Sequence, residues 1–238
     1  MSVPRPPGRG AADARSGGIP GTIIPLEQRA GAPLPLEELL PLAIRLAGAL
    51  ADLHGQGAIH GSLEPAHILL DPSTGEVTLA SAGLAARKST TLTERSLPYI
   101  SPEQTGLMDR PVDTRSDLYS LGVVLYELLA GRLPFEAEDA IGWMHGHVAR
   151  QPRPLEQVRP SLSRPLIDIV DKLLAKLPDD RYQSARGLRH DLERCWRDWR
   201  ELGVLAPFPL GERDVSEELR IPQALYGRQA ERATLRAA

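Results

Sequence analysis

Apolar residues recur at three- and four-residue spacing over much of the chain, which is the pattern of amphipathic helices. The pattern predicts helices over the segments 39–53, 116–130, 137–150, 162–176 and 185–202. The first should end at Gly55 and Gly57 and the second at Gly131, because glycine tolerates the left-handed backbone that closes many helices. Ser116 and Asp117 are expected to supply the capping oxygen and the negative charge at the start of the second helix.

Strand signals are few and short. Two apolar runs, 68–70 and 77–79, flank the turn-forming sequence Asp-Pro-Ser-Thr-Gly at 71–75 and are predicted to form a β-hairpin. Residues 1–33 are rich in Pro, Gly, Ala and Arg with little periodicity, so we expect disorder there apart from a short strand near 21–26. The expected fold class is therefore mainly α, and α+β overall.

Composition and charge narrow the class of protein. A length of 238 residues and an apolar content of 42% fit one globular domain with extensions. The formal net charge of −3 gives little electrostatic support to a nucleic-acid partner. The apolar runs are too short to span a bilayer, the first residues lack the apolar run of a signal peptide, and the single Cys195 excludes an intramolecular disulfide. We therefore expect a cytoplasmic protein that binds neither nucleic acid nor membrane.

The segment 97–135 carries the motifs most specific to one family. It contains Ser-Pro-Glu at 101–103 and Asp-Leu-Tyr-Ser-Leu-Gly at 117–122. These sequences resemble the Ala-Pro-Glu motif and the buried Asp-x-Tyr/Trp-Ser-x-Gly helix of eukaryotic-type Ser/Thr protein kinases. Because the matches follow one another almost without interruption, this resemblance explains the segment better than a generic buried helix does.

The resemblance implies a kinase-like C-lobe over residues 34–203, with the small N-lobe absent or vestigial in 1–33. It also implies that Arg181, in the sequence Pro-Asp-Asp-Arg-Tyr, forms a buried ion pair with Glu103. The structural positions of the family then fall on His60, Gly83, Glu103, Asp117, Gly122 and Arg181.

Residues 59–70 stand in the place of the family's catalytic loop, but with different chemistry. Ser62 stands where kinases use Asp to accept the substrate proton, Glu64 where Lys steadies the phosphoryl group, and His67 where Asn holds magnesium. A serine hydroxyl is a weak base, a glutamate repels phosphate, and imidazole is a poor magnesium ligand. The resemblance therefore implies that these catalytic positions are degenerate.

The nucleotide-binding positions depart from the family as well. Ser81 and Ala82 replace the Asp and Phe of the Asp-Phe-Gly turn, of which only Gly83 remains. No glycine-rich phosphate loop flanked by strands is recognisable. All the lysines of the chain follow the catalytic-loop position: Lys88, Lys172 and Lys176. We therefore expect no cofactor, and ATP or magnesium only if the chain is a working kinase after all.

Beyond residue 203 the composition changes. Residues 204–222 contain several prolines and are predicted to form a linker. Residues 223–238 resemble the opening helix of P-loop ATPase domains in bacterial multidomain signalling proteins. The layout thus resembles the N-terminal part of a bacterial hybrid sensor kinase. It implies a protein partner or a downstream signalling domain, with a homodimer as an alternative.

Two pairs of side chains, one of histidines and one of tryptophans, are interpreted as structural. His145 and His147 lie two residues apart on a predicted helix and point to different sides, so we assign them to the helix surface and not to a metal site. Trp196 and Trp199 fall on one stripe of the last predicted helix, which indicates a core or domain contact.

Together these observations favour a pseudokinase-type regulatory or interaction module of a bacterial signalling protein that does not transfer phosphate. Two alternatives remain open. One is a Ser/Thr protein kinase, ATP-dependent, whose small lobe comes from another chain. The other is a non-functional product of a truncated gene.

Overall fold

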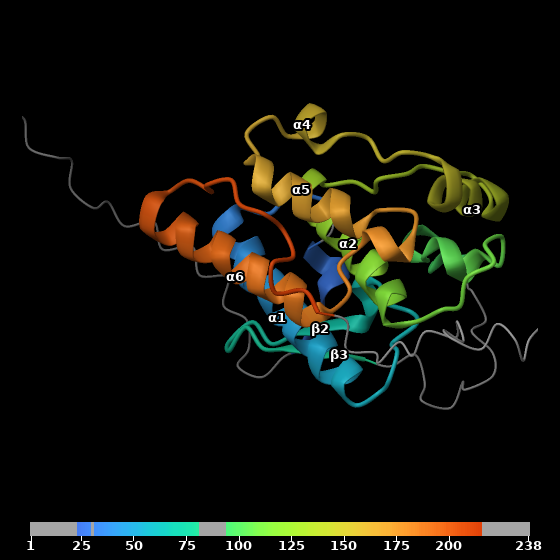
Figure 1. Ribbon diagram of the computed structural model, residues 1–238, viewed down its shortest axis with the longest axis horizontal. Coiled ribbons are helices and arrows are strands. Elements are labelled where there is room, and N and C mark those ends of the chain that lie inside the picture. The colour runs from blue at the N-terminus through green and yellow to red at the C-terminus, as the bar shows by residue number, and fades with distance from the viewer. Residues whose placement is uncertain (1–22, 30, 81–93, 216–238) are drawn as a thin grey trace, which may run out of the picture.

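The computed structural model describes residues 23–29, 31–80 and 94–215. In this part of the chain, helices surround one central helix and a small sheet lies along one side (Figure 1). The α-helices are α1 (Leu36–Gly55), α2 (Thr114–Ala130), α3 (Ala140–Ala149), α4 (Leu155–Val158), α5 (Arg164–Leu173) and α6 (Ala185–Leu202). The 3₁₀ helices are η1 (Leu26–Arg29), η2 (Pro65–His67), η3 (Leu97–Tyr99), η4 (Pro102–Thr105) and η5 (Pro178–Asp180).

The core is organised around α2, in which every residue from 115 to 129 is buried. α5 packs against α2, while α1 and α6 lie along each other. Gly122 allows the close approach of α5, because a Cβ atom there would lie 2.7 Å from the Cβ of Leu173. The five helices predicted from periodicity are all present.

The sheet has the strand order β1-β2-β3 and is antiparallel throughout. Its strands are β1 (Ile24–Pro25), β2 (Ile68–Leu70) and β3 (Val77–Leu79). Ile68 pairs with Leu79, which confirms the predicted hairpin, and Ile24 pairs with Leu70, which confirms a strand near 21–26. Leu26, just after β1, is fully buried. The end of the segment expected to be largely disordered is therefore part of the folded lobe.

The start of α2 differs from the prediction. The capping residue is Asp113, whose carboxylate accepts a hydrogen bond from the backbone N–H of Arg115 at 2.9 Å. Ser116 and Asp117 lie inside the helix and point inward. Ser116 Oγ still takes part in the cap, because it accepts a hydrogen bond from the backbone N–H of Asp113 at 3.3 Å, and Asp117 brings the predicted negative charge to the first turn. Both side chains also make tertiary contacts, Ser116 with Glu103 and Asp117 with the loop at 60–61.

Two further helices are shorter than predicted. α3 begins at Ala140 because the side chain of Asp139 accepts a hydrogen bond from Gly142 N and so caps the helix. α5 ends at Leu173, and the carbonyls of Ala175 and Lys176 accept hydrogen bonds from Arg181. The Arg181 side chain thus supplies donors to carbonyls that lie just beyond the end of α5.

Residues 204–214, the first part of the predicted linker, lie against the lobe. Leu205 is buried, and Phe208 and Leu210 pack partly buried against the core. Trp196 and Trp199 also pack against the core, as their stripe predicts. No helix among the described residues has the length and apolarity needed to cross a membrane. The proposed ATPase-like segment, 223–238, lies outside the described residues.

Candidate functional site

The loop that resembles a catalytic loop is anchored by a carboxylate from the central helix. Asp117 Oδ2 accepts a hydrogen bond from the backbone N–H of His60 at 2.8 Å and lies 2.9 Å from His54 Nε2. Its Oδ1 accepts from the N–H of Gly61 at 2.8 Å. On the other side, Gln104 Nε2 donates to the carbonyl of Gly61 at 2.7 Å. The backbone of this loop is therefore fixed from two directions.

The His60 ring extends this scaffold to the end of β3. Its Nε2 lies 3.2 Å from the carbonyl of Ala80, and its Nδ1 lies 3.4 Å from the backbone N–H of Ser62. Burial lowers the pKa of His60, although the charge of Asp117 opposes that effect. The neutral ring, with its proton on Nε2, can therefore make both contacts: it donates to Ala80 and accepts from Ser62.

The structure brings the predicted degenerate residues together. His67 Nδ1 lies 2.8 Å from the carbonyl oxygen of Ser62, and the Ser62 hydroxyl lies 3.5 Å from the same nitrogen. A carbonyl only accepts hydrogen bonds, so Nδ1 carries the proton. A protonated Nδ1 cannot take a proton from the hydroxyl of Ser62. The pair therefore does not form an activated nucleophile, despite its proximity.

Glu64 lies on the other side of the His67 ring. Its Oε1 is 3.8 Å from His67 Nε2, and its buried Oε2 has no hydrogen-bond partner among the described residues. Burial raises the pKa of Glu64; the charges of His67 and Arg95 oppose the rise, and that of Glu27 adds to it. A carboxyl group, whether charged or neutral, brings no positive charge to the position where kinases hold a phosphoryl group.

The described side chains of this loop differ from those with which kinases hold Mg-ATP. The described positions offer a serine hydroxyl, a buried carboxyl with a raised pKa and an imidazole whose Nδ1 is already engaged. Magnesium instead prefers well-exposed oxygen ligands in octahedral geometry. Within the part of the chain that the structure describes, no group of three or more His, Cys, Asp or Glu side chains is placed to hold a metal ion. Ser81 and Gly83 lie outside the described residues.

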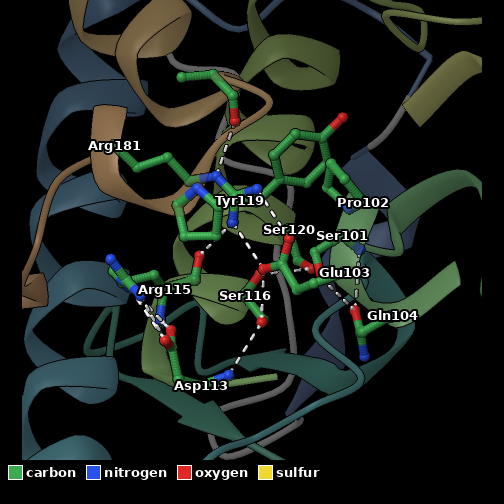
Figure 2. Close-up of polar contacts among 12 residues, drawn as sticks. Ser101, Pro102, Glu103, Gln104, Asp113, Arg115, Ser116, Tyr119, Ser120 and Arg181 are labelled. Carbon is green, nitrogen blue, oxygen red and sulfur yellow. Dashed lines mark hydrogen bonds and ion pairs between the residues drawn. The ribbon is translucent and has the colours of Figure 1, made fainter. Parts of the chain in front are cut away.

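The segment 101–105 is fixed by a buried ion pair (Figure 2). Arg181 Nη1 donates to Glu103 Oε1 at 2.7 Å and Nη2 donates to Oε2 at 2.9 Å, with both side chains fully buried. Ser116 Oγ donates to the same Oε1 at 2.7 Å. Burial alone would raise the pKa of Glu103, but the hydrogen bonds and charge of Arg181 outweigh it and hold that pKa below its usual value. The ion pair implied by the family resemblance is present.

His147 is a structural residue that the sequence interpretation missed. It is fully buried, its Nδ1 lies 3.1 Å from the Tyr119 hydroxyl, and its Nε2 lies 3.0 Å from the carbonyl of Leu97. Burial lowers its pKa to about 4, so the ring is neutral. The surface role predicted for His147 is wrong because α3 turns this face toward α2 and η3, whereas His145 is exposed. A signal was available in Gly146, whose missing side chain lets α3 approach Phe135.

Tyr99 and Glu127 form a second pair that sequence reasoning missed. The Tyr99 hydroxyl donates to Glu127 Oε2 at 2.8 Å. Burial raises the pKa of both groups; the charge of Glu127 raises that of Tyr99 further, and the hydrogen bond from Tyr99 opposes the rise at Glu127. The pair joins η3 to the central helix and so fixes the segment just before 101–105.

Comparisons with known proteins agree with this geometry. The family model described as a protein kinase domain matches residues 25–192. The Serine/threonine-protein kinase pkn3 of Myxococcus xanthus is 32% identical over 203 residues, which cover 74% of this chain and 37% of that protein. The Hybrid signal transduction histidine kinase G of Dictyostelium discoideum is 54% identical over 95 residues, which cover 40% of this chain and 3% of that protein.

A solved structure gives the same result for the fold. The PknI kinase domain of Mycobacterium tuberculosis has a TM-score of 0.53 and 29% identity, covering 71% of this chain and 59% of the solved chain. The chain thus spans less than two thirds of each of these relatives. The predicted fold class, a mainly α, kinase-like C-lobe, is confirmed. The chain belongs to the protein kinase domain family.

Proposed function

We propose that this chain is a pseudokinase-type regulatory or interaction module of a cytoplasmic signalling protein, and that it does not transfer phosphate. One observation carries the proposal. The loop at 60–67 is held by Asp117 in the manner of an ordered catalytic loop, yet inside it the His67 ring binds the Ser62 carbonyl and the Glu64 carboxyl lies 3.8 Å from that ring. The position is ordered without a base, a phosphate-binding cation or a magnesium ligand.

The binding role follows from what the described lobe offers. Its segment 101–105 and the preceding η3 are fixed by buried polar contacts through Glu103, His147 and Glu127. An ordered surface loses little conformational entropy when a partner binds. The residues that follow this segment, 106–112, are mostly exposed, and we expect a protein or a downstream signalling domain to bind there.

A kinase completed by another chain is the second candidate. The names of several relatives as serine/threonine-protein kinases favour it. It requires that a partner supply the lysine and the glycine-rich loop, since the lysines of this chain lie at or after residue 88. It also requires Mg-ATP to bind a set of side chains that does not suit it.

Calorimetric titration of the chain with ATP separates the two candidates. We expect no magnesium-dependent binding in the micromolar range, and no phosphate transfer to a general protein substrate. The control is the same titration with a catalytically competent bacterial Ser/Thr kinase domain under identical conditions. Tight binding that disappears on removal of magnesium would overturn the pseudokinase proposal.

Restoring the family residues tests the same proposal from the opposite side. The combined substitutions Ser62→Asp, Glu64→Lys, His67→Asn and Ser81→Asp should leave phosphate transfer undetectable. Positioning of the phosphates dominates this reaction, and the chain brings no phosphate-gripping lysine of its own. Circular dichroism must show that the variant is folded. Clear autophosphorylation by this variant would mean that the chain holds an unrecognised phosphate-binding element.

A further inference from the structure

The chain reverses after α6 and returns along it. Gly203 closes α6 with a left-handed φ of +69°, and residues 204–214, here called the strap, run back toward the first turn of that helix (Figure 1). Leu205 is 7% exposed, and the guanidinium of Arg194 lies 4.4 Å from the centre of the Phe208 ring. The family match ends at residue 192, so the strap lies outside the part that this chain shares with the family model.

The far end of the strap is held by one carboxylate. Asp214 Oδ2 accepts from the backbone N–H of Gln183 at 2.7 Å. Its Oδ1 accepts from the backbone N–H of Ser184 at 2.8 Å and from the Ser184 hydroxyl at 2.9 Å. Ser184 is itself the N-cap of α6, because its hydroxyl accepts from Gly187 N at 3.0 Å. The carboxylate therefore fixes the first turn of α6, where its charge is also favourable to the helix dipole.

Two further features fix the position of the strap beside the first turn of α6. A side chain at Gly187 would collide with Asp214, so only glycine admits the carboxylate there. Asp191 Oδ2 accepts from the N–H of Gly211 at 2.7 Å and from the Tyr182 hydroxyl at 2.8 Å. The strap is thus tied at two points to the segment 181–184 and the helix that follows it.

The same segment holds the buried ion pair. Gln183 Nε2 donates to the carbonyl of Arg181 at 2.9 Å, and Gln183 Oε1 accepts from Arg115 Nη1 at 3.1 Å. Arg181 in turn holds Glu103 and with it the segment 101–105. Asp214 is therefore connected by direct hydrogen bonds and two peptide units to the segment 101–105, which precedes α2.

We propose that Asp214 is a releasable clasp that couples the strap to the segment 101–105. In the clasped state Asp214 orders 183–184 and supports Arg181. In the released state the strap leaves α6, and Arg181 and 101–105 lose that support. Release is local because few strap residues are buried, and short segments of this kind open at lower free energy than the core. By linkage, a partner whose binding stabilises the segment 101–105 favours the clasped state, and release of the strap weakens the binding of that partner. The proposal does not depend on whether the lobe transfers phosphate.

Hydrogen exchange of the full chain, read by mass spectrometry, tests the clasp. Asp214→Ala should speed exchange at 183–187 and at 101–106 by at least about tenfold, since hydrogen bonds to a charged group are lost. Asp214→Asn keeps one carbonyl acceptor and should give a smaller effect in the same peptides. The matched control is Glu212→Ala, which removes only an exposed ion pair with Arg194 at 3.7 Å. It should leave both peptides unchanged.

Peptides of α1 serve as the internal reference for global unfolding. Faster exchange at 183–187 and 211–214 with 101–106 unchanged would overturn the proposal, because the strap would then be a purely local contact. An equal rise in α1 would overturn it too, since Asp214 would then support the whole fold. If Asp214→Ala fails to fold, Asp214→Asn decides by the same criteria.

Discussion

Replacing Arg181 by alanine is the most direct test of how the lobe is held together. The guanidinium uses all of its N–H donors inside the protein. Two reach the carboxylate of Glu103 at 2.7 and 2.9 Å. The others reach three backbone carbonyls, those of Ala175, Lys176 and Arg115. Arg181→Ala therefore leaves a fully buried carboxylate with Ser116 as its remaining partner, and three carbonyls without this donor.

The expected loss in free energy of unfolding is about 3–5 kcal/mol, the usual cost of leaving one member of a buried pair uncompensated. Glu103→Ala should lie nearer the lower end, because the guanidinium keeps its three carbonyl acceptors in that variant. The double variant should lose less than the sum of the two single variants, since neither charge is then left alone.

Urea denaturation followed by far-UV circular dichroism measures all three variants. The control is Arg189→Ala, which removes an exposed ion pair with Glu193 in α6, with side chains 50% and 47% exposed. Arg189→Ala should lower the free energy of unfolding by at most about 0.5 kcal/mol. If Arg181→Ala shifts the urea midpoint no more than this control does, the pair is not the anchor that the geometry indicates. Strict additivity in the double variant would contradict the reasoning about the uncompensated charge.

Three further predictions follow from particular contacts. Gly122→Ala should lower the free energy of unfolding by about 1–3 kcal/mol, because its Cβ would lie 2.7 Å from that of Leu173. Gly48→Ala on α1 is the control, because its Cβ would lie 3.5 Å from Arg189 Nη1, an ordinary contact distance. It should be neutral or stabilising in the same urea assay. The pKa of Glu103 is depressed by folding, so its contribution is present above the ordinary carboxyl pKa and is lost as pH falls through the folded value; Glu103→Gln should flatten that part of the stability–pH curve. Leu26→Ala should cost about 2–5 kcal/mol and raise the binding of a hydrophobic dye, because Leu26 is fully buried beside the sheet; an unchanged thermal midpoint would show that the segment after β1 is not part of the core.

The sequence predicted most of the helical framework for a physical reason. α5 and α6 bury faces whose apolar residues recur with the helical period, and the predicted bounds of α6 agree with the observed ones. The pairing of Glu103 with Arg181 came from the family resemblance and not from spacing, because the residues are far apart in the chain. The spacing of apolar residues predicts helices and strands, whereas a polar pair between distant residues is predicted only by resemblance to a family whose fold is known.

The burial of the strap and of His147 could not be predicted from the spacing of apolar residues. Residues 204–214 have the proline-containing composition of a linker, yet Leu205 is buried and Asp214 is seated on the first turn of α6. His147 occurs on a helix without a clear polar face, and its burial depends on the neighbouring loop at Leu97. In each case the deciding contact involves a segment distant in sequence, so no local periodicity reports it.

The ordered state of the loop at 60–67 is not by itself a sign of catalysis. Asp117 is a buried carboxylate, and a buried charge needs hydrogen-bond donors whatever the protein does. The N–H groups of His60 and Gly61 supply those donors, so the loop backbone is fixed by the stability of α2 and its surroundings. A lobe can therefore keep the shape of a kinase loop after its reactive groups have been replaced. The pseudokinase proposal therefore rests on the side chains at 62, 64 and 67 and on their contacts, and not on the order of the loop backbone.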